Sequence, residues 1–255
     1  MKKTLLPLIL VLVLIFSINC FATPWDVSTA TYADKAKDVS AKEIYPRDVT
    51  FNPDGTKMYI MGYTADEVYQ YTLSTAWDVS TATYADKSVS IVAQESAPRS
   101  VIFSSDGTKM YIVGSSSDTV YQYTLSTAWD VSTATYADKA KDVSEQETYP
   151  CSVTFNPDGT KMYIVGAITD TVYQYTLSTA WDVSTATYAD KYKDVSEQET
   201  SPYGVTFNPD GTKMYIVGTT SATVYQYTLP SGITWNNITI TKWNGITITI
   251  PLNTQ

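Results

Sequence analysis

The chain has 255 residues, of which 44% are hydrophobic and 17% are charged, a composition that indicates a folded protein and excludes a disordered one. Its formal net charge of −9 argues against a nucleic-acid partner. It contains no histidine, which excludes Ser-His-Asp and Cys-His catalysis and also zinc or copper sites built on imidazole.

The first 22 residues have the pattern of a secretory signal peptide. Lys2 and Lys3 precede an apolar run over residues 5–16, which is too short to span a bilayer comfortably. We therefore expect export to the periplasm, the cell surface or the medium, with no membrane span after cleavage. Two processing routes remain open, cleavage before Thr23 or lipidation of Cys20 as a lipoprotein. An uncleaved membrane anchor is a third alternative.

Residues 23–229 consist of four copies of one unit. The tryptophans of W-D-V-S-T-A-T-Y-A-D-K recur every 52 residues, at Trp25, Trp77, Trp129 and Trp181. The segments F-[NS]-[PS]-D-G-T-K-M-Y-I and V-Y-Q-Y-T-L keep the same step, with no insertion or deletion between copies. A fixed period of this length is the signature of a repeat architecture.

Each unit is predicted to contain four strands and no helix, since no segment has a helical period. In the first unit the strands are Val49–Phe51, Lys57–Met61, Val68–Leu73 and a last one from Val79 to Tyr84 or beyond. Asn52–Gly55 has the composition of a tight turn. Four antiparallel strands in 52 residues make one blade of an all-β propeller, because such a sheet has two apolar faces that neighbouring blades must cover.

The ends of the repeat array leave the closure of the ring open. Residues 25–37 match the fourth strand of a blade, so we expect them to complete the last blade, formed by residues 203–229, and close a four-bladed propeller. Alternatively, Trp235–Ile240 supplies the outer strand of that blade, or two chains join into a larger ring.

The tail over residues 230–255 has a short repeat of its own. Ile/Thr alternation on both sides of Trp243-Asn-Gly245 predicts a β-hairpin. This hairpin either covers an open sheet edge or serves as a strand for attachment or oligomerisation.

The run V-T-F-N-P-D-G-T-K-M-Y-I-V-G followed by V-Y-Q-Y-T-L resembles the repeat of YVTN-type and lactonase-like propellers. The resemblance covers residues 25–229 and implies the propeller fold. Because the matching residues are turn and core positions, it implies no particular activity. The repeated Asp54, Asp106, Asp158 and Asp210 are interpreted as turn formers, and the repeated aromatic residues as packing between blades.

The copies differ mainly in loops expected on one face of the propeller. Four unlike residues follow the repeated prolines and begin the inner strands at the channel mouth, namely Arg47, Arg99, Cys151 and Tyr203. With Tyr45 and Tyr149 of the same loops, they are the candidate ligand-binding residues. Two simpler interpretations remain, neutral drift of tolerant loops and pairing of the arginines with neighbouring glutamates.

The same loops contain one glutamate per copy, at Glu43, Glu95, Glu147 and Glu199. If the ring closes, these carboxylates encircle its rim, and oxygen ligands suit calcium or magnesium. They are candidate ligands for calcium, and no other cofactor is expected. A solvated acidic rim is the alternative.

The absence of a visible acid–base cluster favours a non-catalytic protein. We expect an exported binding module that presents its variable loops to a protein or glycan ligand. The alternatives are a structural protein assembled as a homo-oligomer through the Ile/Thr tail and a lactonase-like hydrolase working with carboxylates, arginine and a bound metal.

Overall fold

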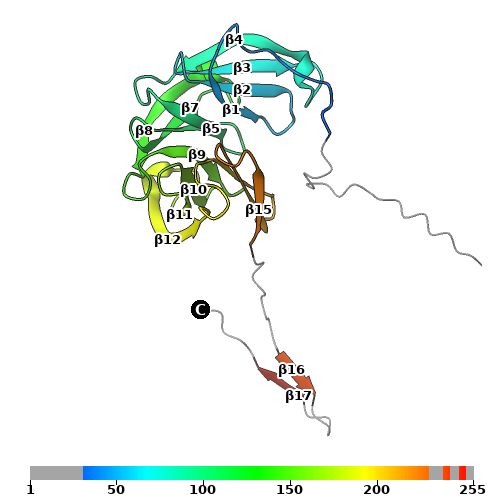
Figure 1. Cartoon of the computed structure of the whole chain (residues 1–255), viewed down its shortest axis with the longest axis vertical. Helices are drawn as coiled ribbons and strands as arrows, with labels where there is room; N and C mark the ends of the chain where they lie inside the picture. The colour runs from blue at the N-terminus through cyan, green and yellow to red at the C-terminus, as the bar shows by residue number, and fades with distance from the viewer. Residues whose placement is uncertain (1–30, 230–237, 242–246, 251–255) are drawn as a thin grey trace, which may run out of the picture. The chain divides into compact units, whose positions relative to one another are not determined.

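The 52-residue unit folds as one antiparallel sheet whose four strands pair in chain order (Figure 1). The structure is a computed structural model that describes residues 31–229, 238–241 and 247–250. The first blade contains β1 (Pro46–Phe51), β2 (Lys57–Gly62), β3 (Glu67–Leu73) and β4 (Ala82–Ser90). The second contains β5 (Pro98–Phe103), β6 (Lys109–Gly114), β7 (Thr119–Leu125) and β8 (Ala134–Asp142). The third contains β9 (Pro150–Phe155), β10 (Lys161–Gly166), β11 (Thr171–Leu177) and β12 (Ala186–Asp194).

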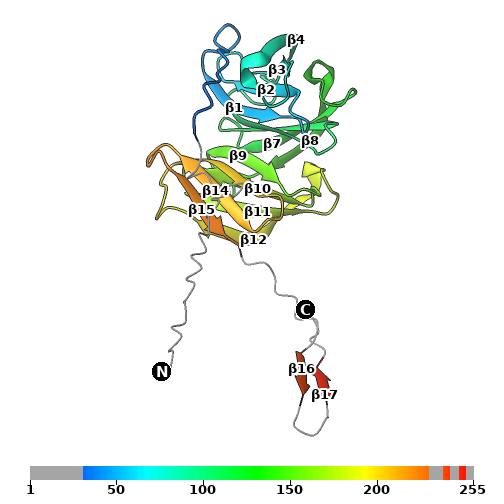
Figure 2. The ribbon, with the colours of Figure 1, turned by 90° about the vertical axis from the view of Figure 1, so that its right-hand side faces the viewer.

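The all-β propeller class is confirmed, with the first strand of each blade innermost and the fourth outermost (Figure 1). The inner strands contact one another in sequence, β1 with β5, β5 with β9, and β9 with β13 (Pro202–Phe207). The fourth blade continues through β14 (Lys213–Gly218) and β15 (Val224–Thr228), drawn in orange in Figure 2. In the part of the chain that the structure describes, no helix is long and apolar enough to cross a membrane, and the predicted signal peptide lies outside that part.

The outer strand starts later than predicted. Residues expected to open it form a single 3-10 turn in each complete blade, η2 (Val79–Thr81), η3 (Val131–Thr133) and η4 (Val183–Thr185). In the first blade, Asp78 precedes the turn and its carboxylate accepts a hydrogen bond from the Ser80 amide. Such a capped turn satisfies amides that a strand would have to pair with a neighbour.

The predicted closure of the last blade is absent from the described residues. Its sheet has three strands, and residues 31–37, which match a fourth strand by sequence, form none, while residues 25–30 lie outside the description. The tail does pair as predicted, β16 (Ile238–Thr241) against β17 (Thr247–Ile250) in antiparallel register. Among the described residues these two strands form a sheet of their own, separate from the three strands of the last blade, and residues 235–237 of the alternative outer strand lie outside the description.

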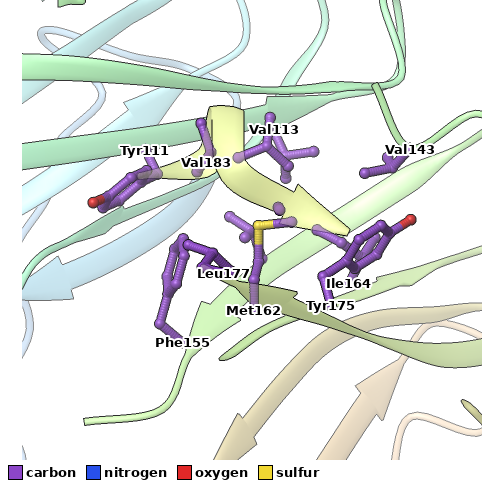
Figure 3. Packing of buried hydrophobic residues seen from close by; sticks show 12 residues of the cluster. Tyr111, Val113, Val143, Phe155, Met162, Ile164, Tyr175, Leu177 and Val183 are labelled. Atoms are coloured by element: carbon purple, nitrogen blue, oxygen red, sulfur yellow. The ribbon is translucent and has the colours of Figure 1, made fainter. Parts of the chain in front are cut away.

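Successive blades share one apolar interface, which Figure 3 shows between the second and third blades. One blade contributes side chains of its second and third strands, and the next contributes side chains of its first two strands and its 3-10 turn. At the first junction these are Tyr59, Met61 and Val68 against Val101, Met110, Ile112 and Val131. At the second they are Tyr111, Val113 and Val120 against Val153, Met162, Ile164 and Val183. The predicted aromatic packing between blades is confirmed by the contact of Tyr59 with Phe103, at 4.4 Å between ring centroids.

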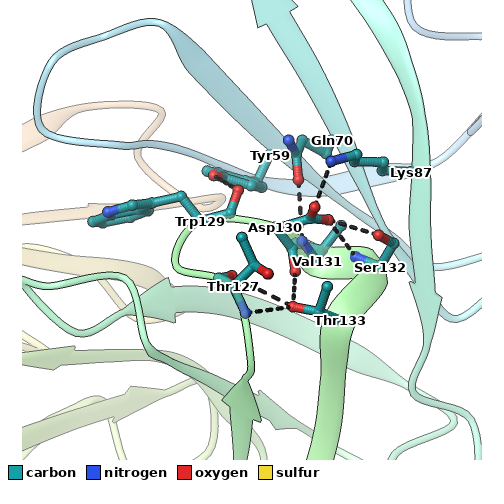
Figure 4. A network of polar contacts seen from close by, with 9 residues as sticks. All are labelled: Tyr59, Gln70, Lys87, Thr127, Trp129, Asp130, Val131, Ser132 and Thr133. Atoms are coloured by element: carbon teal, nitrogen blue, oxygen red, sulfur yellow. Dashed lines mark hydrogen bonds and ion pairs between the residues drawn. The ribbon is translucent and has the colours of Figure 1, made fainter.

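A polar seam runs beside this core (Figure 4). The Tyr59 hydroxyl donates to the carbonyl oxygen of Trp129 at 2.8 Å, and the Gln70 side-chain oxygen accepts from the Val131 amide at 3.1 Å. Lys87 forms an ion pair with Asp130. The seam recurs one blade later, with Tyr111 and Trp181, Gln122 and Val183, and Lys139 and Asp182. Because buried polar groups must be paired, this repeated seam helps to fix how one blade sits on the next.

The turns of the invariant face are structural, as predicted. The Asp54 carboxylate accepts hydrogen bonds within its own turn, from the amide of Thr56 at 2.9 Å and its hydroxyl at 2.6 Å. Gly55 has φ of 71°, and its carbonyl accepts from the Trp77 amide. The indole of Trp77 lies directly over Gly55, so a β-carbon there would overlap the ring. Glycine is therefore needed twice, for its backbone angle and for its lack of a side chain.

Candidate functional site

The inner strands bring unlike residues from near-identical blades to one place. Arg99, the second residue of β5, has its guanidinium carbon 4.8 Å from the ring centre of Tyr149, 5.8 Å from that of Tyr63 and 5.9 Å from that of Tyr203. Arg47 lies 4.6 Å from the Tyr63 ring. One cation thus contacts tyrosines of the first, third and fourth blades, an arrangement that cation–π attraction favours. We call Arg47, Arg99, Tyr63, Tyr149 and Tyr203 the mouth cluster.

Arg99 is held by neutral partners. Its guanidinium donates to the hydroxyls of Tyr149 and, at 3.3 Å, of Ser115. The ion pairs between described residues are made by lysines, so the interpretation that Arg47 or Arg99 pairs with a nearby glutamate is wrong. A guanidinium without a carboxylate partner remains able to bind an anion or a developing negative charge.

Cys151 lies beside the mouth cluster, and both its thiol and the phenol of Tyr203 within the cluster are uncharged. Burial raises the pKa of the Cys151 thiol to about 12, and the thiol donates to the Tyr149 carbonyl at 3.4 Å. Burial, with the nearby Tyr149, also raises the pKa of Tyr203. Cys151 is therefore a neutral thiol at physiological pH and not a nucleophile, since the thiolate is the reactive form. Tyr45, the remaining candidate, has an exposed side chain, and its carbonyl oxygen accepts a hydrogen bond from the amide of Tyr63 at 3.2 Å.

A cavity of about 200 Å³ is lined by all four inner strands, including Asp48, Ser100, Ser152 and Val205. One Asp48 oxygen accepts from the Val101 amide at 2.9 Å and the other from the Val49 amide at 2.8 Å. Burial raises the pKa of Asp48. A carboxyl group with a raised pKa in a cavity is a candidate general base.

Sequence reasoning missed Asp48, although a signal was present. The residues at its position in the later copies are Ser100, Ser152 and Gly204, so the first copy alone has an acid there. The candidate residues were those directly after each repeated proline, and Asp48 is one position further along the chain.

The four glutamates do not form a shared rim. All four are buried, each inside the loops of its own blade. The Glu147 carboxylate, for example, accepts from the amides of Tyr149 at 2.8 Å and Thr169 at 3.2 Å and from the Thr169 hydroxyl at 2.7 Å. Within the described part of the chain, no group of three or more acidic or thiol side chains is placed to hold a metal ion. The four carboxylates therefore bind backbone and side-chain donors of their own blades instead of encircling the rim.

Each glutamate instead joins two loops on the variable face, the one before the inner strand and the one between the second and third strands. A glycine ends the second strand in every blade, and at Gly166 a β-carbon would overlap both the Glu147 side chain and the Tyr149 carbonyl. The buried carboxylate and the glycine together hold the loops from which the mouth cluster projects.

The stability that the Glu199 carboxylate contributes by joining its two loops depends on pH. Burial disfavours its charge, but hydrogen bonds from Ser221, Ser201 and Thr220 outweigh burial and lower its pKa to about 2. Its stabilising effect is therefore complete above the unfolded-state pKa and is lost as the pH falls through about 2. We expect Glu199→Gln to be less stable than the wild type at pH 7, with the gap closing below about pH 4.5. Urea unfolding of both proteins over this pH range measures the gap, and a gap that stays constant to pH 2 contradicts the assignment.

The comparisons with known proteins identify the class. A family model described as "Lactonase, 7-bladed beta-propeller" matches residues 48–232, and the chain belongs to this family. No curated protein matches the sequence significantly.

Two solved structures have the same fold. The first, a protein of Bacteroides uniformis assigned as a 6-phosphogluconolactonase, has 15% identity and a TM-score of 0.53, with 80% of this chain and 53% of that chain covered. The second, the periplasmic gluconolactonase of Pseudomonas aeruginosa, has 16% identity and a TM-score of 0.50, with 81% and 53% covered. The chain thus spans about half the length of these structures.

These findings correct the functional prediction. The family match and the gluconolactonase neighbours point to a lactonase-like hydrolase, so the prediction of a non-catalytic binding module is wrong. Near-identical blades bring unlike residues together in the structure, because several of the positions at which the copies differ lie at or near the start of the inner strands.

Proposed function

We propose that the protein hydrolyses a sugar lactone at the mouth of the propeller channel. The observation that carries this proposal is Arg99, a partly buried guanidinium that has three tyrosine rings around it and no ion pair with a described carboxylate, in a propeller of the lactonase family. An asymmetric, positively charged mouth is unusual for a chain of net charge −9 and suits an anionic ligand.

The chemistry needs a water molecule, a proton acceptor and stabilisation of an oxyanion. Water adds to the lactone carbonyl carbon, the carbonyl oxygen gains negative charge, and the ring C–O bond then breaks to give an open-chain hydroxy acid. The Arg99 guanidinium and the Tyr149 hydroxyl are the groups that stabilise the oxyanion in this proposal. Asp48, with its raised pKa, accepts the proton of the attacking water and returns it to the ring oxygen as the C–O bond breaks.

A phosphorylated sugar lactone is the substrate class that the charges favour. Arg47 and Arg99 both approach Tyr63, so two cations lie on one side of the mouth. One can hold a phosphate while the other faces the reacting carbonyl, because arginine binds planar anions through paired N–H donors. The 6-phosphogluconolactonase assignment of the Bacteroides uniformis protein supports this choice.

Arg99→Gln tests the proposal. We expect kcat/KM for 6-phosphogluconolactone to fall about 100-fold or more, because an uncharged amide stabilises the oxyanion far less. Lys161→Gln is the control, since Lys161 is exposed at the start of β10, the strand end opposite Gly166 and the Glu147 loops. Hydrolysis by Arg99→Gln at the wild-type rate, with unchanged stability, contradicts the role of Arg99.

We also propose that the enzyme acts outside the cytoplasm, on the strength of the signal-peptide pattern over residues 1–22. The periplasmic gluconolactonase of Pseudomonas aeruginosa supports this location by similarity of fold. Mass measurement of the exported protein distinguishes a chain that begins at Thr23 from one that begins at a lipidated Cys20.

A further inference from the structure

The last blade carries one half of the repeated interface, and no described strand of another blade packs against it as the next blade does at the earlier junctions. By the 52-residue step, Tyr215, Val217 and Val224 correspond to Tyr59, Met61 and Val68. Val217 is 44% exposed and Val224 is 51% exposed, whereas Met61 and Val68 are fully buried. The buried Tyr215 hydroxyl has no hydrogen-bond partner among the described residues.

The first blade carries the other half. Val49, Met58, Ile60 and Val79 correspond to the four residues that receive the preceding blade at the first junction. Val49 is 51% exposed, whereas its counterpart Val101 is buried. A cavity of about 440 Å³ lies on this face, lined by these four side chains among others. Apolar side chains from the face of another blade can fill a cavity of this size.

We infer that these two faces bind each other between two copies of the chain. The last blade of one copy packs against the first blade of its partner, and the reverse contact closes the assembly. Four blades from each copy make a ring of eight, which lies within the known range of propellers. A head-to-tail contact of this kind forms a closed ring when its rotation closes, and a two-fold axis provides that closure here.

The polar seam defines the contacts to expect (Figure 4). At the first junction Tyr59 donates to the Trp129 carbonyl, and Gln70 accepts from the Val131 amide. At the proposed interface Tyr215 takes the place of Tyr59 and donates to the Trp77 carbonyl of the partner copy. Gln226 takes the place of Gln70 and accepts from the Val79 amide of the partner copy. Gln226 is exposed, and no described group donates to the Trp77 carbonyl. Both halves of the seam are therefore present in each chain.

Closure within one chain is the competing arrangement, and the exposures disfavour it. Val49 and Val217 are both open to solvent in the same chain, so they do not cover each other. The strands of the first and last blades make no contact comparable to those between neighbouring blades in the described residues.

The test is the mass of the purified protein by sedimentation velocity and native mass spectrometry, with three valine variants. We expect the wild type at twice the mass of one chain. Val49→Asp and Val217→Asp each place a charge in the interface and should give a species of one-chain mass. Val92→Asp is the control, because Val92 is 54% exposed on a loop outside both faces; this variant should keep the doubled mass.

Mixing the two interface variants gives the sharpest result. Each retains one intact face, Val49→Asp that of the last blade and Val217→Asp that of the first, so the mixture should regain a two-chain species that neither forms alone. A wild type of one-chain mass at every concentration overturns the inference and indicates closure within the chain. Failure of the mixture to associate, or wild-type species larger than two chains, overturns the head-to-tail ring.

Discussion

Glu147→Ala is expected to destabilise the protein by about 3–5 kcal/mol, because it removes the acceptor of several buried donors at once. The amides of Tyr149 and Thr169 and the Thr169 hydroxyl lose their partner, and the carboxylate that joins the two loops is gone. Urea unfolding at neutral pH measures the loss. Glu147→Gln should cost less, since its carbonyl oxygen replaces one acceptor.

The neighbouring Glu145 provides a matched control. It lies in the same loop but is exposed, so Glu145→Ala should change the free energy of unfolding by no more than about 0.5 kcal/mol. Equal effects at the two positions contradict the structural role of Glu147. They would also reopen the interpretation that the glutamates form a solvated acidic rim.

Gly159→Ala is expected to destabilise the protein by about 2–4 kcal/mol through two effects, a backbone angle that disfavours a side chain and a collision with an indole. Gly159 has φ of 72°, and a β-carbon there would overlap the Trp181 ring. Trp181 cannot move away freely, because its ring packs against Phe155 at 5.3 Å between centroids. Thermal unfolding and urea titration measure the effect.

Gly211→Ala isolates the collision from the backbone strain. Gly211 has nearly the same φ, 71°, but no atom of the described residues lies within 4 Å of the position of its β-carbon. We therefore expect Gly211→Ala to cost only the strain, about 1–2 kcal/mol. If both alanine variants lose the same stability, the stacked tryptophan is not what requires glycine at position 159.

The sequence was sufficient to predict the blades because each level of the pattern agrees with the others. The alternation in V-Y-Q-Y-T-L, the turn N-P-D-G and the 52-residue step all favour the same four-stranded sheet. The sequence did not predict the 3-10 turns, because Val79 and Thr81 favour strands. The turn forms there because the Asp78 side chain accepts a hydrogen bond from the Ser80 amide. Local propensity is weaker than a satisfied hydrogen bond at such a position.

The candidate site was predicted in part. Its location at the start of the inner strands followed from comparing the copies, and Arg99, Tyr149 and Tyr203 do come together there. The glutamates were misread because a loop sequence does not show whether a carboxylate turns outward or binds its own backbone. Asp48 was missed because the sequence, although it has an acid at this position in the first copy alone, does not show that the side chain is buried in the channel.

The central claim, that this propeller hydrolyses a sugar lactone, is tested most directly by the acid that the wild-type protein releases from 6-phosphogluconolactone. A pH-stat measures this release against the spontaneous hydrolysis of the lactone in buffer. The account predicts a rate that rises with enzyme concentration, saturates with substrate and is higher for the phosphorylated lactone than for gluconolactone. A folded protein that adds nothing to the spontaneous rate with either lactone contradicts it.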